Sequence, residues 1–301
     1  MKNVRLSQMS EEDRVKFHSI LLGILQKIIE ICEENDIHWF VGYGACIGAI
    51  RHKGCIPWDD DIDVCMPRPD YDRFVEICRK MELGDYEFAS PYDTPGYYVH
   101  IARMYDKNTT MYFSTQSLHV GGIFIDIFPI DGVSDGNVES NLKRCRFWQR
   151  ISYYSRLYFS KSDLLRYIKE MNIKDICFYF LYIIITSLCR RPIQKESLRM
   201  IEKTIRKYPY ERSEYCMFYE PKVYGMRNII PRKWIEETIW VPFESIQVRI
   251  PKHYHDYLTH IYGDYMTPPP DDKKDDDRHF VKYLDFEKRL SREEILALLS
   301  E

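Results

Sequence analysis

The stretch GYGACIGAIRHKGCIPWDDDIDV, residues 42–64, places four aspartates within five positions directly after a glycine-rich, basic segment. The residues before it, IHWFV, are apolar, and Ile62 and Val64 interleave with the acids. This pattern predicts a strand, a glycine turn, a short helix and a second, acidic strand. Neighbouring carboxylates repel one another by about 1 kcal/mol per close pair in water, so we expect a bound cation to offset the repulsion.

Helical and strand patterns alternate on both sides of this stretch. Ser10 and Asp13 have the spacing of a capping box, and apolar residues at helical spacing follow, so a first helix of about 25 residues is expected. Strand patterns lie at YEFAS, YYVHIARMY and GIFIDIFPI, an amphipathic helix at DYDRFVEICRKM, and a last helix near residues 292–299. The predicted fold class is therefore α+β (mixed α/β), a mixed sheet flanked by helices.

The composition changes along the chain of 301 residues. We expect a catalytic core at residues 1–135, a helical, Tyr-rich insertion at 136–208 and a mixed C-terminal region at 209–301 that completes the site. The boundary near residue 135 carries no flexible linker. The division at this point is therefore a soft boundary.

The charge balance and the cysteines limit the function classes. With 43 Lys and Arg against 46 Asp and Glu, the formal charge is −3, which gives no global reason to expect a nucleic-acid partner. The nine cysteines are scattered and form no C-x-x-C pair, which favours a reducing cytoplasm over a zinc site or disulfide framework. The first residues lack an apolar stretch, so a cytoplasmic location without a cleaved signal is expected.

The acidic cluster points to a metal site. If a strand begins at Asp61, then Asp61 and Asp63 project from one face and can share a cation, with Asp59 as a further candidate ligand. Hard oxygen ligands favour Mg²⁺ or Mn²⁺. The alternative is an acidic loop exposed to water. An EF-hand is excluded, because that loop requires glycine where Val64 stands.

A third carboxylate is expected from the strand GIFIDIFPIDG, residues 122–132. Asp126 lies between two isoleucines, where an aspartate is costly unless it is hydrogen-bonded or ligates a metal. We take Asp126 as the third catalytic and metal-ligating acid beside Asp61 and Asp63, the alternative being a structural aspartate. Asp131 follows a proline and is expected to cap a turn.

The glycines and cations before the acids form a candidate phosphate pocket. Gly42 and Gly44 bring the backbone of a helix start within reach of an oxyanion, and Arg51 and Lys53 add positive charge. These four residues are predicted to bind a metal-bound diphosphate. The glycines alone could equally serve a tight turn.

These motifs together resemble the LicD/fukutin family of phosphotransferases, whose core is similar to the nucleotidyltransferase fold. The resemblance covers residues 20–130 and again 261–283, and places the glycine turn, the basic element and the acids on the residues named above. The ending YGDYMTPPPDDKKDDDRH, residues 262–279, also resembles the family's, which adds Lys273 and His279 as donor-binding candidates. Arg278 departs from the family's histidine, and a solvated charge run is the alternative for this tail.

The resemblance implies transfer of a phosphorylated alcohol, phosphocholine or a polyol phosphate, from a CDP-linked donor such as CDP-choline. The acceptor is a hydroxyl of a cell-surface glycan (lipopolysaccharide, teichoic acid or capsule) or of its lipid-linked precursor. The metal acids would neutralise the donor's diphosphate, and Asp126 or Asp59 would take the hydroxyl proton. Three alternatives remain: a nucleotidyltransferase that moves a nucleoside monophosphate, a metal-dependent glycosyltransferase, and a non-catalytic glycan- or nucleotide-binding scaffold.

One apolar segment, ICFYFLYIIITSLC, begins at Ile176 and ends at Cys189. Its 14 residues are fewer than the roughly 20 that cross a bilayer. The segment is flanked by Lys174, Arg190 and Arg191, which suits both a buried core helix and a peripheral contact with the inner face of the cell membrane.

Overall fold

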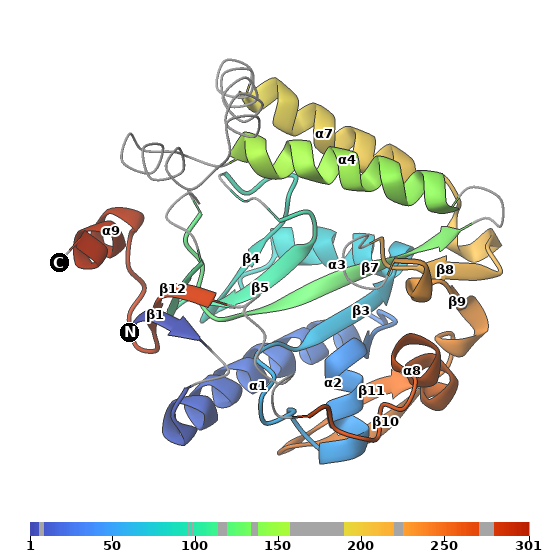
Figure 1. The fold of residues 1–301 in the computed structure, drawn as a ribbon, viewed down its shortest axis with the longest axis horizontal. Helices are drawn as coiled ribbons and strands as arrows, with labels where there is room; N and C mark the ends of the chain where they lie inside the picture. Colours follow the sequence, from blue (N-terminus) through green and yellow to red (C-terminus); the bar gives the residue numbers. More distant parts are fainter. Residues whose placement is uncertain are drawn as a thin grey trace.

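The computed structural model describes residues 1–5, 9–95, 97, 99–113, 119–133, 138–156, 190–219, 225–270 and 280–300. Its centre is a seven-stranded mixed sheet flanked by helices, which confirms the predicted α+β class (Figure 1). The main path of the sheet runs in the order β2 (Phe40–Val41), β3 (Asp63–Pro67), β7 (Phe124–Val133), β5 (Ala102–Asp106) and β4 (Tyr86–Ala89). Two short strands, β8 (Tyr215–Met217) and β9 (Ile230–Pro231), extend the sheet from β7.

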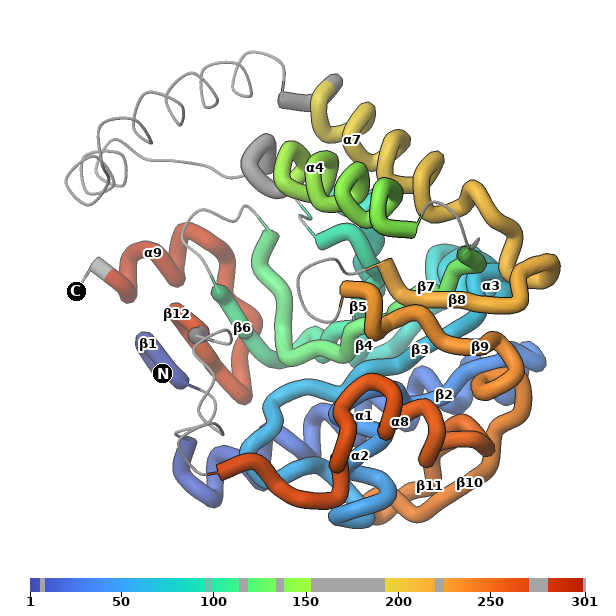
Figure 2. The backbone as a smooth tube through the Cα atoms, turned by 45° about the vertical axis from the view of Figure 1, so that its right-hand side comes forward, coloured from blue at the N-terminus to red at the C-terminus, as the bar shows by residue number. Residues whose placement is uncertain are grey.

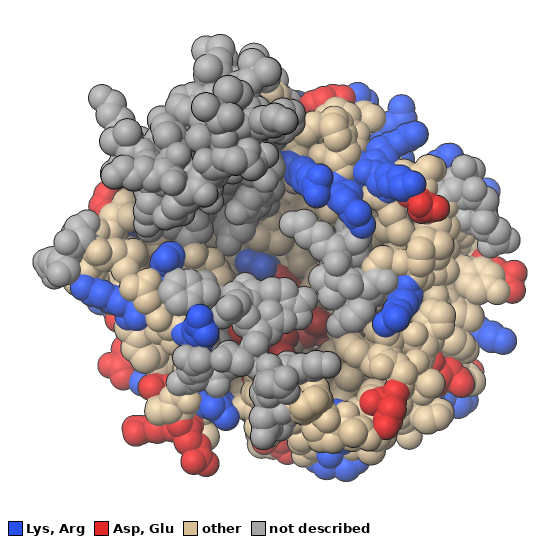
Figure 3. Space-filling view, in the orientation of Figure 1, with Lys and Arg blue, Asp and Glu red and all other residues tan. Residues whose placement is uncertain are grey.

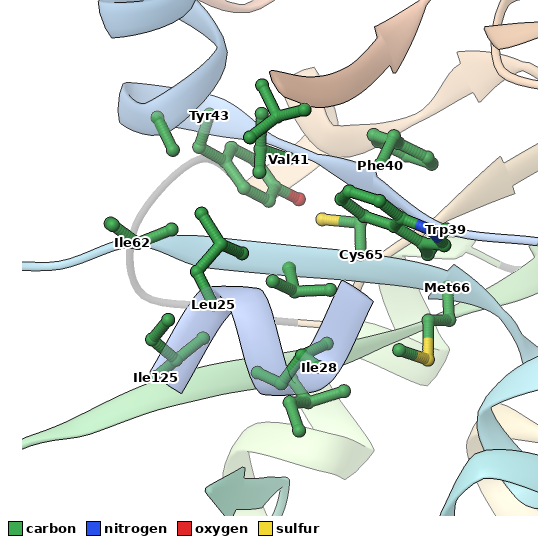
Figure 4. Close-up of a cluster of buried hydrophobic side chains, with 14 of the residues drawn as sticks. Leu25, Ile28, Trp39, Phe40, Val41, Tyr43, Ile62, Cys65, Met66 and Ile125 are labelled. Atoms are coloured by element: carbon green, nitrogen blue, oxygen red, sulfur yellow. The ribbon is translucent and has the colours of Figure 1, made fainter. Parts of the chain in front are cut away.

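The two faces of this sheet differ in chemistry. β3 and β7 run parallel, whereas β2, β5 and β4 pair antiparallel with their neighbours. Val64, Ile127 and Ala102 share one face and are buried in the main core. The first helix, α1 (Glu11–Glu34), contributes Leu25 and Ile28 to that core, and Figure 4 shows both side chains among the buried residues beside β3 and β7.

The start of α1 follows the predicted capping box. The Ser10 hydroxyl accepts the Asp13 backbone N–H at 3.1 Å, which satisfies one of the helix's unpaired amides. The expected last helix is also present. The other helices are α2 (Tyr43–Ile47), which continues into a π-helical turn at Gly48–His52, α3 (Arg68–Lys80), α4 (Val138–Arg156), α7 (Arg190–Ile205), α8 (Tyr254–Tyr262) and α9 (Arg292–Ser300).

Segments far apart in the sequence are joined outside the central sheet. The N-terminal strand β1 (Lys2–Arg5) pairs with β12 (Phe280–Asp285), which also pairs with β6 (Thr110–Tyr112), as Figure 2 shows. A hairpin of β10 (Thr238–Phe243) and β11 (Ile246–Pro251) packs beside β2 and the π-helical turn at Gly48–His52. Three single-turn helices complete the described part, at Tyr210–Arg212, Gly225–Asn228 and Arg232–Trp234.

The prediction that Asp131 caps a turn is wrong. Asp131 lies within β7 with its side chain 2% exposed, and Arg68 binds both of its oxygens at 2.7 and 2.5 Å. Burial alone would lower the pKa of Arg68, but the Asp131 carboxylate outweighs this and raises it. The pair therefore ties the start of α3 to β7 from the inside.

Candidate active site

Three neighbouring strands place charged side chains in one row across the sheet. Asp126 of β7 is the register partner of both Asp63 of β3 and Arg103 of β5. Register partners point to the same face of a sheet, so these three residues share the face opposite the α1 core. Two of the acids predicted from sequence are thus side by side.

Arg103 was not predicted as a site residue, and it engages Asp126 directly. Its Nε donates to Asp126 Oδ1 at 2.5 Å and its Nη2 to Oδ2 at 3.3 Å. The guanidinium also lies 3.8 Å from the centre of the Phe124 ring, which shields the pair on one side. The signal in the sequence that could have identified Arg103 is its position, a charged residue between Ala102 and Met104, which are both buried in the same strand.

The other acids approach this row from a loop. Asp59, Asp60 and Asp61 are half-buried, and each offers a carboxylate oxygen within 4.8 Å of the others. β3 begins at Asp63, so Asp61 lies in the loop before this strand. The prediction that Asp61 and Asp63 project from one face of a strand assumed a strand start at Asp61, which the structure does not show. Figure 3 shows this face of the molecule hollowed near its centre, with acidic atoms in the floor.

The pKa of Asp63 is shifted by burial and by all of these neighbouring charges. Burial raises its pKa well above the ordinary value, and the carboxylates of Asp61, Asp126, Asp59 and Asp60 raise it further. Four further carboxylates therefore lie close enough to Asp63 to act on its charge. Among the described residues, the carboxylates close enough to one another to share a hard divalent cation are those of Asp59, Asp60 and Asp61. This group includes Asp59 and Asp61 of the predicted ligands, but neither Asp63 nor Asp126.

The glycine turn packs tightly against the acids. A Cβ atom on Gly44 would lie 2.6 Å from Asp59 Oδ2, and one on Gly42 would lie 2.5 Å from Cys65 Sγ, so neither position has space for a side chain. The Gly42 N–H donates to the Asp63 carbonyl at 2.9 Å, and the Tyr43 N–H to the Tyr257 hydroxyl at 3.2 Å. These two amides are thus used within the fold. The absence of a side chain lets Gly44 approach Asp59 and lets Gly42 approach Cys65.

The two predicted cations differ in their settings. Arg51 donates to the Tyr265 carbonyl at 2.6 Å and lies 5.8 Å from the Trp58 ring. Burial lowers the pKa of Arg51, and Asp59 partly restores it, which places this cation near the acidic loop. Lys53 is exposed at the end of the π-helical turn with φ of 62°.

Aromatic residues form a wall beside the acids. Phe128, two positions after Asp126 and on the same face, packs against Phe218 with ring centres 4.5 Å apart. Phe218 in turn stacks on His100, whose ring accepts a hydrogen bond from Gln149 of α4 at 3.1 Å. These rings were not predicted, because they come from three separate parts of the chain.

The remaining predicted positions belong to the C-terminal tail and to the apolar segment. Lys273, His279 and the apolar segment that begins at Ile176 lie outside the described residues. No helix of the described part is long and apolar enough to cross a membrane.

Comparisons with known proteins match much of this chain. The sequence model of the LicD/FKTN/FKRP nucleotidyltransferase domain matches residues 36–172, which include every acid described above. The chain is 31% identical over 259 residues to the lipopolysaccharide cholinephosphotransferase LicD of Haemophilus influenzae, covering 84% of this chain and 91% of that protein. An uncharacterized protein of Rickettsia typhi is 33% identical over 57 residues, 18% of its length, and one of Rickettsia prowazekii is 31% identical over 66 residues, 25% of its length.

Proposed function

The chain belongs to the LicD family of phosphotransferases, and we propose that it moves phosphocholine from CDP-choline to a hydroxyl of a membrane-linked glycan of the lipopolysaccharide type. The observation that carries this proposal is the 31% identity over 91% of a lipopolysaccharide cholinephosphotransferase, together with the acids of the loop before β3 and of the neighbouring strands β3 and β7. We place the reaction on the cytoplasmic side, where a lipid-linked precursor would be reached from within the cell.

In this proposal Asp61 and Asp63 hold a Mg²⁺ or Mn²⁺ ion, with Asp126 behind them and Asp59 alongside. When bound, the ion neutralises charge on the donor's diphosphate and on the departing CMP. Arg51, held near Asp59, adds a second positive charge at the same oxygens, and Lys53 extends it toward solvent.

The transfer replaces one P–O bond with another. The acceptor oxygen attacks the phosphorus of the phosphocholine group, the bond to CMP breaks, and the hydroxyl proton must go to a base. Both oxygens of Asp126 accept hydrogen bonds from Arg103, so this carboxylate is already engaged within the protein. We therefore assign the proton to Asp59, whose Oδ2 lies against the small Gly44, and give Arg103 the role of holding Asp126 in place.

The test is an assay of donor choice. The purified chain with Mg²⁺ is incubated separately with CDP-choline, CDP-ribitol, CDP-glycerol and CTP, with a glycan acceptor present. We expect release of CMP from CDP-choline and labelled phosphocholine on the acceptor, with Asp61→Asn as the inactive control. Release of pyrophosphate from CTP, with the nucleotide on the acceptor, would instead make the chain a nucleotidyltransferase.

A further inference from the structure

Positive charge is concentrated in one part of this protein. Residues 138–156 and 190–207 contain twelve Lys and Arg against three Glu, although the whole chain has a formal charge of −3. These residues form α4, α7 and the turn directly after α7, and the two helices pack against each other at one edge of the fold (Figure 1). A local excess of this size creates a positive potential that the composition of the chain conceals.

The cations follow the exposed faces of both helices. On α4 one exposed stripe begins at Lys143 and continues three, four and seven residues later with Arg146, Phe147 and Arg150. On α7 the exposed positions at spacings of four are Lys195, Arg199 and Lys203. The opposite faces supply the small core that joins the two helices, through residues such as Leu142, Cys145 and Ile201.

An apolar ring stands in the middle of the α4 stripe. Phe147 is 57% exposed, which is unusual for a large aromatic side chain between cations. A helix with cations and an exposed aromatic residue on one face is suited to the boundary between lipid headgroups and acyl chains. Among the described residues the Phe147 ring packs edge-on against Trp148, with ring centres 5.3 Å apart, and most of its surface stays exposed.

The positive helices and the acidic site face the same way. Figure 3 shows basic side chains gathered over α4 and α7 on the face that carries the central hollow. The contact from α4 to the site is short: Gln149 bonds to His100, which stacks on Phe218, which packs on Phe128 beside the acids. A surface that α4 rests on would therefore lie next to the site.

From these observations we propose that the exposed face of α4 and α7 docks on an anionic lipid bilayer. The partner is the headgroup layer of acidic phospholipids, with the cations among phosphates and the Phe147 ring below them. The proposal rests on the proposed function only in that a lipid-borne acceptor would then be presented at the neighbouring site. The docking itself requires no catalysis.

The experiment measures binding of the full chain to vesicles without any substrate. Vesicles of phosphatidylglycerol with phosphatidylcholine are compared with pure phosphatidylcholine by co-sedimentation, at low and at high salt. We expect binding to the anionic vesicles alone and weakening by salt, because screening shortens the range of the attraction. Lys143→Gln with Arg146→Gln should weaken binding about tenfold or more, and Phe147→Ser by a smaller factor.

A matched control removes two exposed lysines elsewhere. Lys80 forms an ion pair with Glu76, four residues away, in the same way that Lys143 pairs with Glu139. Lys252 likewise pairs with Glu237. Lys80→Gln with Lys252→Gln should bind vesicles within about twofold of wild type, since no cation of the docking face is lost. Circular dichroism melts confirm that all variants fold.

Three results would overturn the proposal. They are wild type remaining in the supernatant with anionic vesicles, the α4 variants binding as tightly as wild type, and binding to single-stranded DNA without binding to vesicles. Phosphotransfer to a soluble acceptor is measured in parallel. Because the substituted residues lie outside the site, that activity should be unchanged, and its absence in wild type would count against the proposed function alone.

Discussion

Replacing Asp63 by asparagine should stabilise the metal-free protein while removing its response to metal. Asp63 lies beside Asp126 across the strands and near Asp61, and its raised pKa records both burial and the repulsion of these neighbours. At a separation of about 4 Å each unit-charge pair costs about 1 kcal/mol even with the dielectric constant of water. Relief from the two nearest acids is therefore about 2 kcal/mol, or roughly 4 °C in melting temperature for a chain of this size.

The direction of the pH dependence follows from the same shift. An aspartate whose folded pKa is raised holds its proton longer in the folded state than in the unfolded one. Stability contributed by the protonated form is complete below the ordinary pKa of about 4 and is lost as pH rises through the raised value. Metal-free wild type should lose stability over this window, and Asp63→Asn should lose less.

Magnesium should reverse the order of the two proteins. A ligand at a hundredfold excess over its dissociation constant stabilises the folded state by about 2.7 kcal/mol. Wild type should therefore gain about 5 °C with Mg²⁺, whereas Asp63→Asn should gain little and show no turnover. Melts by calorimetry in EDTA and in Mg²⁺, from pH 4 to 8, measure both effects. A variant that melts below wild type in EDTA at pH 7, or that gains as much from Mg²⁺, would refute the reasoning.

Three further predictions concern the surrounding residues. Arg51→Ala and Lys53→Ala should raise the KM for the CDP-linked donor more than that for the acceptor, since only the donor carries a diphosphate; unchanged donor KM and kcat in both would make them surface charges. Arg103→Gln should lower kcat at least tenfold. Mg²⁺ binding, measured by calorimetric titration, should become tighter or stay unchanged because Asp126 loses its partner, and weaker Mg²⁺ binding would contradict this role. Arg68→Met should lower the free energy of unfolding by about 3–5 kcal/mol, as measured by denaturant titration, and the double variant Arg68→Met with Asp131→Leu should recover most of that loss. An equal loss in the single and the double variant would show that the ion pair itself is stabilising.

The local elements were open to prediction because their signals lie close together in the chain. The capping box at Ser10 and the apolar spacing after it define α1, and alternation of acids with Ile62 and Val64 identifies β3. Such patterns report which side of an element is buried, and burial is the main driving force for each one. For the same reason the α+β class and the closely spaced acids were predictable.

The tertiary structure decided what lies opposite those acids. Nothing in the sequence states that β5 pairs with β7 in the register that sets Arg103 against Asp126, or that β3 begins at Asp63 and leaves Asp61 in a loop. Asp131 shows the same limit, because its neighbours suggested a turn and its partner Arg68 is 63 residues away. Strand register and ion pairing depend on which distant segments meet.

The amino-acid pattern alone was therefore enough to predict a carboxylate cluster after a glycine turn. It was also enough to predict helices and strands around that cluster. The tertiary structure alone decided which cation faces which acid, which rings stand beside them, and that the basic faces of α4 and α7 share the side of the site. The physical reason is that periodicity within a segment records its own burial. The partners of a buried charge are instead selected by the packing of the whole chain.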